Sequence, residues 1–424
     1  MPGSLAVIGA GWAGLAAAVE AVKTGWSVTL FEMAELAGGR ARNLHDERLV
    51  LDNGQHILIG GYVETLRLMR EVGVDPEAVL LRTPLRLTEP DGRGLHLPAG
   101  SPLVAFALAT WRRQGWTLGE RLALLAAAGS WAMRRFHCPA DWTVARLTQG
   151  MPQALRRDLI DPMCVAALNT PASEASATVF LRVLRDALFG GPGSADLLLP
   201  RAGLGDLFPV PALALLRDRG AAVRLSTRVQ RLEPLGAQWR VDGETFDAVL
   251  LATPPSEAAR LTEAAAPAWS AAVAAFRYEP IITVYVDAGS TRLPEPMLAL
   301  PPAPNAPAQF VFDRGQLGGP TGLLAFVISG AQPWVDAGRD ATIEATLAQA
   351  RDALRVHLRG DLRVILSIAE KRATFRCVPA LARPPAAVAP SLVAVGDYVA
   401  GPYPATLEGA VRSAVQAVAM LPVS

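Results

Sequence analysis

A glycine pattern close to the N-terminus constrains the fold of this chain more than any other sequence feature. The short apolar run 5–8 leads into Gly-x-Gly-x-x-Gly at residues 9–14, and the alanine-rich stretch 15–23 follows directly. A second apolar run, residues 26–31, ends at Glu32. This order predicts a strand, a glycine turn, a helix and a second strand. Such a βαβ opening requires a parallel sheet with a right-handed crossover.

Each glycine of the pattern has its own physical task. Gly9 permits the tight turn, Gly11 lets the backbone approach a pyrophosphate, and Gly14 lets the helix pack closely on the strand. The helix N-terminus then faces the anion, while Glu32 can accept hydrogen bonds from ribose hydroxyls and disfavours a 2′-phosphate. The pattern alone would also suit a structural turn, but its context predicts dinucleotide binding. The expected contacts are Gly9, Gly11, Trp12, Ala13, Gly14 and Glu32.

Composition excludes several other classes of protein. The 424 residues are 51% hydrophobic and 19% charged, so the chain can bury a large core and is not a disordered, collagen-like or disulfide-stapled protein. The net charge of +1 gives no basis for a nucleic-acid partner. Three widely spaced cysteines without a C-x-x-C pair fit a reducing compartment, and we expect no metal site. No cleavable leader and no apolar run of about 18 residues is found, so we expect a cytoplasmic protein.

A second glycine pair distinguishes a flavin from a nicotinamide nucleotide. Gly38, Gly39 and Arg40 follow the second strand, where an ordinary turn before a surface arginine is the alternative. Together with residues 6–18 and 28–32, they resemble the FAD-binding opening of the amine oxidase and phytoene desaturase superfamily. In that superfamily the Gly-Gly-Arg lies by the pyrophosphate. The resemblance therefore implies FAD contacts at Gly39 and Arg40.

The middle of the chain carries the same resemblance. Residues 228–233, followed by 247–255, resemble the strands that close over the adenine end of FAD in the superfamily. The resemblance implies that Val229 lends its backbone to the adenine.

The C-terminal part resembles the superfamily's flavin motif over residues 392–398 and 404–410. Asp397 would then bond the ribitol chain. The helix that starts near Thr406 would aim its N-terminus at the isoalloxazine pyrimidine, where a partial positive charge stabilises the anionic reduced flavin. The implied contacts are Gly396, Asp397, Thr406, Leu407 and Ala410.

Further segments narrow the resemblance. Residues 52–62, 370–375 with 381–385, and 403–413 resemble the hydroxysqualene dehydroxylases of bacterial squalene and hopanoid synthesis, formerly described as squalene-associated FAD-dependent desaturases. The likeness extends over essentially the whole chain and implies flavin contacts from Gly54, Gln55 and His56. It implies a reduction in which hydroxysqualene loses its allylic hydroxyl, gains hydride from reduced flavin and becomes squalene. It also implies a lipophilic isoprenoid substrate and neighbouring squalene-pathway enzymes as partners.

The order of these signals predicts an α/β fold with interleaved domains. We expect a discontinuous Rossmann-like FAD-binding core and an inserted α+β substrate cap, as in the superfamily. The core would comprise residues 1–85, 200–260 and 385–424. The cap would comprise a helical part, 86–199, and a second part with a long β run and a helix, 261–384.

The implied chemistry asks for a proton donor, because hydroxide is a poor leaving group. His56 is the first candidate, since it lies in the segment that lines the flavin in relatives. A neutral histidine that only hydrogen-bonds flavin or backbone is the alternative. Tyr398, Tyr403 and Arg372 are the other candidate donors. We expect Asp52 to brace its loop rather than to react.

Three alternatives to this function remain at the level of sequence. Amine oxidases commonly place a lysine near flavin N5, but Ile281 or its neighbours fill that place, and the only lysines are Lys23 and Lys371. A carotenoid- or phytoene-type desaturase is the second alternative. A non-enzymatic prenyl-lipid carrier of the same fold is the third, and retention of every FAD motif argues against it. No second Gly-x-Gly-x-x-Gly is present, so the electron donor stays open.

Two apolar segments, 103–111 and 122–133, are each followed by an arginine pair. Apolar side chains with tryptophans and flanking arginines are typical of a surface that lies on lipid. Buried cap helices with snorkelling arginines give the same pattern. Peripheral contact with the inner face of the cell membrane is therefore one expectation, and a buried cap is the other.

Overall fold

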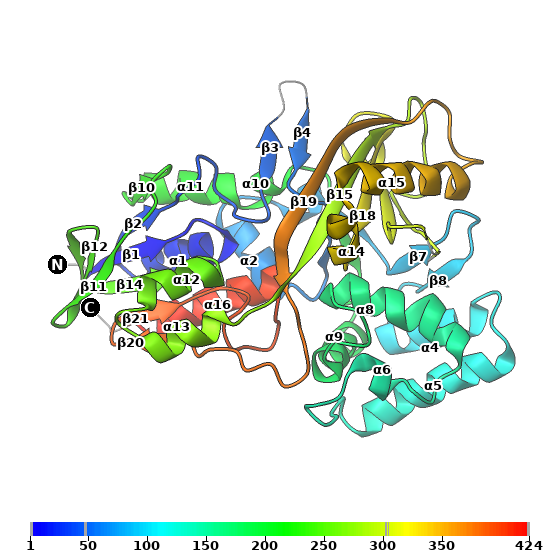
Figure 1. Ribbon diagram of the computed structural model, residues 1–424, viewed down its shortest axis with the longest axis horizontal. Coiled ribbons are helices and arrows are strands. Elements are labelled where there is room, and N and C mark those ends of the chain that lie inside the picture. Colours follow the sequence, from blue (N-terminus) through cyan, green and yellow to red (C-terminus); the bar gives the residue numbers. More distant parts are fainter. Residues whose placement is uncertain (1–2, 46–48, 302, 304, 422–424) are drawn as a thin grey trace.

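A parallel sheet assembled from three distant parts of the chain organises the protein (Figure 1). The computed structural model describes residues 3–45, 49–301, 303 and 305–421. The strand order is β10-β2-β1-β14-β21-β20, and only the pair β21–β20 is antiparallel. The strands are β1 (Ser4–Ile8), β2 (Ser27–Phe31), β10 (Ala222–Arg224), β14 (Ala248–Leu251), β20 (Ala387–Ala389) and β21 (Leu392–Ala394).

One face of this sheet is covered by helices, with α1 (Trp12–Lys23) at the centre. Nine of its twelve residues are buried, because α1 packs on the sheet and also contacts α11 (Pro209–Asp218) and α16 (Leu407–Ala419). A helix enclosed on several sides needs small side chains, which explains its alanines. α2 (Val63–Glu71) packs against α16.

The other face of the sheet has its own core. Leu5 and Val7 of β1 face the helices, whereas Ala6 and Ile8 face this second core, as the period of two requires. It is covered by an antiparallel meander and two helices. These are β11 (Leu232–Leu235), β12 (Gln238–Val241), β13 (Glu244–Phe246), α12 (Pro255–Thr262) and α13 (Pro267–Ala274).

A second, antiparallel sheet has the order β16-β17-β18-β15-β19. Its two longest strands run side by side from the parallel sheet toward the opposite end of the molecule (Figure 1). The strands are β15 (Tyr278–Asp287), β16 (Met297–Ala299), β17 (Phe310–Asp313), β18 (Leu323–Ile328) and β19 (Arg363–Phe375), and the helices beside them are α14 (Gln332–Ala337) and α15 (Arg339–Ala353).

A helical block lies at the end of the molecule away from the parallel sheet (Figure 1). It has its own apolar core. Its helices are α4 (Pro102–Arg112), α5 (Leu118–Met133), α6 (Val144–Leu147), α7 (Gln153–Leu155), α8 (Asp161–Leu168) and α9 (Ala177–Phe189), with a π-helical turn at Arg156–Ile160. Within the described part of the chain, no helix is both long and apolar enough to cross a membrane.

Short elements connect these parts. They include the three-stranded sheet β5-β9-β6 and the antiparallel pairs β3–β4 and β7–β8, and β7–β8 lies beside the helical block (Figure 1). The strands are β3 (Asn43–His45), β4 (Val50–Asp52), β5 (Leu58–Ile59), β6 (Leu80–Thr83), β7 (Arg86–Thr88), β8 (Gly94–His96) and β9 (Leu197–Pro200), and the helical turns are α3 (Pro76–Val79), α10 (Leu204–Leu207) and a 3-10 turn at Arg314–Leu317.

Two buried polar side chains tie the parts together. Asn169, which ends α8 with φ of 46°, donates to the Glu279 carbonyl and the Thr374 hydroxyl at 3.0 Å each. Glu408, fully buried in α16, accepts hydrogen bonds from the N–H groups of Glu64 and Thr65 in the first turn of α2. A carboxylate at a helix N-terminus satisfies free N–H groups and opposes the helix dipole.

The structure differs from the sequence-based expectation in the middle of the chain, where residues 228–233 resemble a strand. Residues 228–231 form no strand, because the N–H groups of Gln230 and Arg231 bond the side chain of Asp242 instead of a neighbouring strand. The expected domain boundaries stay a prediction.

The contact between α1 and β1 gives a first test. A Cβ on Gly14 would lie 1.8 Å from the Gly9 carbonyl oxygen, and both atoms belong to rigid backbone. Gly14→Ala should therefore lower the free energy of unfolding by about 1–3 kcal/mol or more, as overpacking does. Thermal and denaturant unfolding of the purified protein measures this change.

Gly129→Ala is the matched control. Gly129 lies inside α5, and a Cβ there would meet no atom within 4 Å. Alanine is favoured over glycine in a helix interior by about 0.5–1 kcal/mol, so this variant should be neutral or more stable. Equal losses in both variants would contradict the close-packing argument.

Candidate active site

The turn after β1 presents backbone N–H groups at the carboxyl end of the central strand. Gly9 has φ of 106°, and its N–H donates to the Phe31 carbonyl at 2.7 Å. The N-cap of α1 is Gly11, which has no side chain to cap the helix. Trp12 and Ala13 open the helix and are buried, and Trp12 donates to the Ala41 carbonyl at 3.0 Å. The free N–H groups of this first turn can bind an anion.

Glu32 lies at the end of β2, directly beside this turn. Its carboxylate accepts hydrogen bonds from the N–H groups of Ala10 at 2.7 Å and Ala34 at 2.8 Å. A carboxylate has about four acceptor positions, so further bonds remain available. The Glu32 carboxylate therefore places a negative charge where it could accept hydrogen bonds from the ribose hydroxyls of a bound dinucleotide.

The second glycine pair packs against the first glycine turn. Gly38 pairs with Gly11 in an isolated β-bridge and donates to the Ala10 carbonyl at 2.8 Å. Gly38 and Gly39 have φ of 115° and 62°, and a Cβ on Gly39 would lie 3.2 Å from the Gly11 Cα. Two segments of bare backbone therefore meet at the N-terminus of α1.

An ion pair joins this loop to the C-terminal motif. Arg40 Nη2 lies 2.7 Å from Asp397 Oδ1, and Arg40 Nη1 donates to the Ala373 carbonyl at 2.8 Å. Desolvation opposes the charge of Arg40, but the nearby Asp397 carboxylate raises the pKa of Arg40, so the guanidinium stays protonated. Two of the predicted cofactor contacts are thus brought together from positions 357 residues apart.

The segment 52–56 is held from both sides. Asp52 accepts from the Leu204 N–H at 2.8 Å through its side chain, and burial raises the pKa of that carboxyl group. Asn53 donates to the Arg40 carbonyl at 3.1 Å. Gln55 accepts from Arg314 at 3.2 Å. These hydrogen bonds fix the backbone around Gly54, and the Asp52 carboxylate is one of the groups that hold this segment in place.

His56 ends this segment half-buried. Its Nδ1 lies 3.0 Å from the Gly54 carbonyl oxygen, which can only accept, so Nδ1 carries the hydrogen and Nε2 is the free acceptor. Desolvation lowers the pKa of His56, the bond to Gly54 opposes this, and the charge of Arg40 lowers it further. The imidazole is therefore neutral near pH 7, and Nε2 is the atom that can gain and give a proton.

The other candidate donors lie in different surroundings. Tyr398 is 1% exposed, and within the described residues its hydroxyl has no hydrogen-bond partner. The ring of Tyr403 is close to two guanidinium groups, those of Arg182 and Arg412, at 5.2 and 4.9 Å from the ring centre. Arg372 is exposed and donates to the Ser256 hydroxyl at 2.8 Å.

The C-terminal motif turns sharply between β21 and α16. Gly396 has φ of 150°, and the Asp397 carbonyl accepts from the Ala405 N–H at 3.2 Å. Thr406 is the N-cap of α16 and accepts from the Gly409 N–H at 2.9 Å. Leu407 begins the helix, while Ala410 is buried in the same core as α1.

Val229 lies on the other side of the parallel sheet from α1. It is 3% exposed, and its carbonyl accepts from Arg260 at 2.7 Å. The predicted use of this backbone by adenine would therefore share the carbonyl with Arg260 or rely on the N–H.

Three residues near the site were missed by the sequence reasoning. Thr283 of β15 is 1% exposed, its hydroxyl has no partner within the described residues, and a Cβ on Gly54 would lie 3.7 Å from it. The Tyr278 hydroxyl is likewise buried without a partner, and burial raises the pKa of Tyr278 to about 12. Glu370 accepts from Asn53 at 3.1 Å. A lone threonine in the apolar run 281–286 was the signal available for Thr283.

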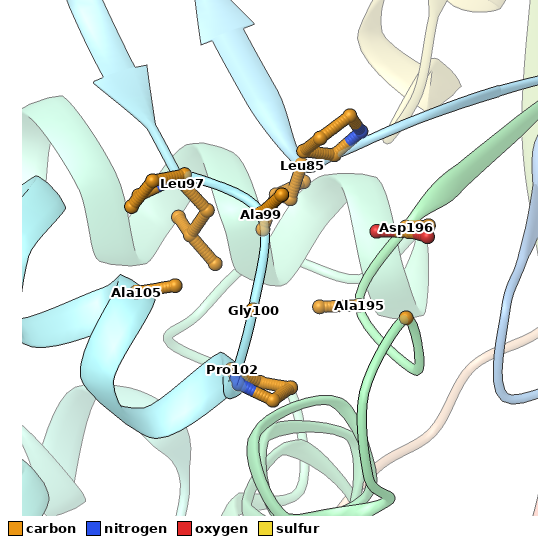
Figure 2. Close-up of a pocket in the computed structure, with 11 residues that line it drawn as sticks. Leu85, Leu97, Ala99, Gly100, Pro102, Ala105, Ala195 and Asp196 are labelled. Carbon is orange, nitrogen blue, oxygen red and sulfur yellow. The ribbon is translucent and has the colours of Figure 1, made fainter.

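A small hollow lies elsewhere, in the helical block (Figure 2). It is formed by the end of the β7–β8 hairpin, the start of α4 and the loop before β9, and Leu85, Pro102 and Ala195 are among the residues that line it. None of the predicted site residues is among its lining residues.

Comparison with known proteins gives the family. A family model described as flavin containing amine oxidoreductase matches residues 12–421. The hydroxysqualene dehydroxylase of Sinorhizobium fredii is 28% identical over 97% of each chain, and that of Rhodopseudomonas palustris is 29% identical over 96% of this chain and 95% of its own. An oxidoreductase from Methanosarcina mazei shares the fold, with a TM-score of 0.72 and 18% identity over 98% of this chain and 100% of its own.

These findings confirm the α/β fold class, the flavin cofactor and the superfamily expected from the sequence. The match to the family covers almost the whole chain, including the glycine turn from Trp12 onward and the C-terminal motif. The chain therefore belongs to the flavin-containing amine oxidoreductase family and is an FAD-dependent oxidoreductase.

Proposed function

We propose that this enzyme reduces hydroxysqualene to squalene. The carbon that bears the allylic hydroxyl loses that group as water and gains a hydride, which consumes two electrons and a proton. Reduced flavin supplies the hydride. The observation that carries this proposal is the similarity to two hydroxysqualene dehydroxylases over at least 95% of each chain compared.

The residues present fit FAD. Gly11 and Gly39 leave backbone without side chains at the N-terminus of α1. A Cβ on Gly39 would crowd the backbone of Gly11. The pyrophosphate would bind there, Glu32 would bind ribose hydroxyls, and Asp397 would bind the ribitol chain. The buried hydroxyls of Tyr398 and Thr283 are further groups that a bound molecule could satisfy.

We propose His56 as the group that protonates the departing hydroxyl. The bond from Nδ1 to the Gly54 carbonyl fixes the tautomer and leaves Nε2 as the atom that can gain a proton and give it to the departing hydroxyl. Because desolvation lowers the pKa of His56, its protonated form is rare at neutral pH and is a stronger acid when it forms. Tyr398 is the next candidate, although burial raises the pKa of its phenol.

The residues around the candidate site suit an apolar substrate better than an amine substrate. Ile281 and Ile368 pack against a cluster that includes Leu197, Leu199 and Tyr285. β15 contains no lysine, so this strand offers no counterpart to the lysine that amine oxidases commonly place near flavin N5. Burial of an apolar chain contributes roughly 25 cal/mol per Å², so an isoprenoid could bind with few polar contacts.

An anaerobic single-turnover experiment tests the reaction. The bound flavin is photoreduced, hydroxysqualene is added, and squalene and flavin reoxidation are measured together. Equal amounts of squalene formed and flavin reoxidised would support the proposal. A reduced flavin that stays reduced with hydroxysqualene would exclude it.

The role of Glu32 leads to a binding prediction. Glu32→Ala should weaken FAD binding about ten- to a hundredfold, because a charge-assisted hydrogen bond is lost. Reconstitution of the apoprotein with FAD, followed by flavin fluorescence, gives the affinity. Glu233→Ala, at an exposed position of β11, is the control and should bind FAD like the wild type.

His56 can be tested by separating turnover from flavin content. If it protonates the hydroxyl, His56→Ala should lower turnover by roughly 10²–10⁴-fold with FAD retained. If it only supports the loop, FAD should be lost while turnover per bound flavin stays nearly intact. A variant with full flavin and full rate would remove His56 from both roles. His137→Ala, at an exposed histidine, is the control.

The pH dependence follows from the lowered pKa of His56. The protonated form of His56 is lost as the pH rises through the pKa of His56. Because that pKa lies below the ordinary 6.5, turnover should start to fall at a pH below 6.5 and should continue to fall as the pH rises. The loss should approach tenfold per pH unit. Turnover that is flat between about pH 5 and 8 in the wild type would argue for a hydrogen-bonding role only.

A further inference from the structure

The helical block carries apolar side chains on a surface where polar ones are normal. Along α5, all exposed residues except Gly119 form one stripe, at helical spacing, that contains no charge. The stripe is about 24 Å long, as expected for a 16-residue helix. Its members are Leu118, Leu122, Ala126, Gly129 and Met133, and Met133 is 83% exposed.

α4 also exposes apolar side chains. Pro102 and Ala105 on its inner side line the hollow in Figure 2, whereas four large apolar residues of α4 are exposed. Trp111 is 51% exposed at the end of α4, close in sequence to the start of α5. We call the exposed apolar residues of both helices the α4–α5 surface: Leu103, Val104, Leu108, Trp111, Leu118, Leu122, Ala126, Gly129 and Met133.

Not every apolar residue of this region is exposed. Trp116, Trp131 and Phe136 are buried in the core of the block. Arg113 is also buried and forms an ion pair with Glu89 at 2.5 Å. The core of the block is therefore already supplied with apolar side chains, and the α4–α5 surface is additional to it.

The charge around this surface has one sign. Residues 101–136 contain five arginines and a single acidic residue, Glu120, which is held in a capping box with Thr117. Arg112, Arg134 and Arg135 are exposed at the ends of α4 and α5. Within the part of the chain that the structure describes, none of these three forms an ion pair.

We propose that the α4–α5 surface docks on a lipid bilayer that contains anionic lipids. Exposed apolar patches of this kind are rare on soluble monomers and indicate a binding surface. A bilayer matches the combination of an apolar stripe, an exposed tryptophan and an arginine rim, because apolar groups enter the acyl boundary while arginines meet the headgroups. A second copy of this chain would place the same positive rims against each other, so charge disfavours that occupant.

Vesicle sedimentation of the FAD-loaded enzyme tests docking without turnover, so its result is independent of the proposed reaction. We expect the wild type to bind vesicles of phosphatidylethanolamine with phosphatidylglycerol more tightly than vesicles of phosphatidylcholine. Leu122→Glu with Met133→Glu should weaken binding more than tenfold. Arg134→Ala and Arg135→Ala should each weaken binding to the anionic vesicles about fivefold.

Val356→Glu is the control, because Val356 is 62% exposed but lies after α15, outside the surface. Flavin absorbance of every variant shows that it is folded. The proposal fails if the wild type stays in the supernatant with both vesicles, or if Val356→Glu weakens binding as much as the surface variants. It also fails if light scattering shows a dimer that Leu122→Glu with Met133→Glu dissociates while no vesicle binds.

Discussion

The position of β1 between β2 and β14 is the constraint on which the rest of the molecule depends. Parallel strands cannot be joined by tight turns, so each neighbour of β1 must arrive by a crossover. The crossover to β2 is one helix, whereas more than two hundred residues separate β2 from β14. That long interval contains the helical block, and the return from β14 to β21 contains the antiparallel sheet. The candidate site lies where these connecting segments return to the carboxyl ends of the parallel strands, as ligand sites do in other open α/β sheets.

Much of this arrangement could be predicted from the sequence, because its causes are local. Four glycines lie where the backbone requires a positive φ or a close approach, and their spacing forms a recognisable pattern in the sequence. They are Gly9, Gly14, Gly38 and Gly39. The pairing of Arg40 with Asp397 has no such local sign. The resemblance named both residues as cofactor contacts but did not predict their pairing, and a spacing of 357 residues carries no periodicity that could reveal it.

Other features lay beyond sequence reasoning for a clear physical reason. Thr283 has the strand propensity of its neighbours, so its sequence context does not tell a satisfied core hydroxyl from an unsatisfied one. The short strand β9 takes part in a sheet only because β5 and β6 are brought to it. For α4 and α5, the spacing of the apolar residues could not show which face of each helix is buried, since both faces are apolar. Burial separates them: Trp131 and Leu124 face the core, while Leu122 and Met133 face outward.

The late return of β21 and α16 also has a meaning during synthesis of the chain. While residues 1–380 emerge from the ribosome, β1 can pair with β2 and β14, but β14 lacks its neighbour β21 and α1 lacks α16. The Arg40 guanidinium then has no carboxylate from residue 397, and the N-terminus of α2 has none from Glu408. A nascent chain therefore carries the glycine turn for most of its synthesis without the groups that complete the site. Synthesis that stops before Asp397 and Glu408 therefore leaves a chain that contains the glycine turn but lacks both carboxylates.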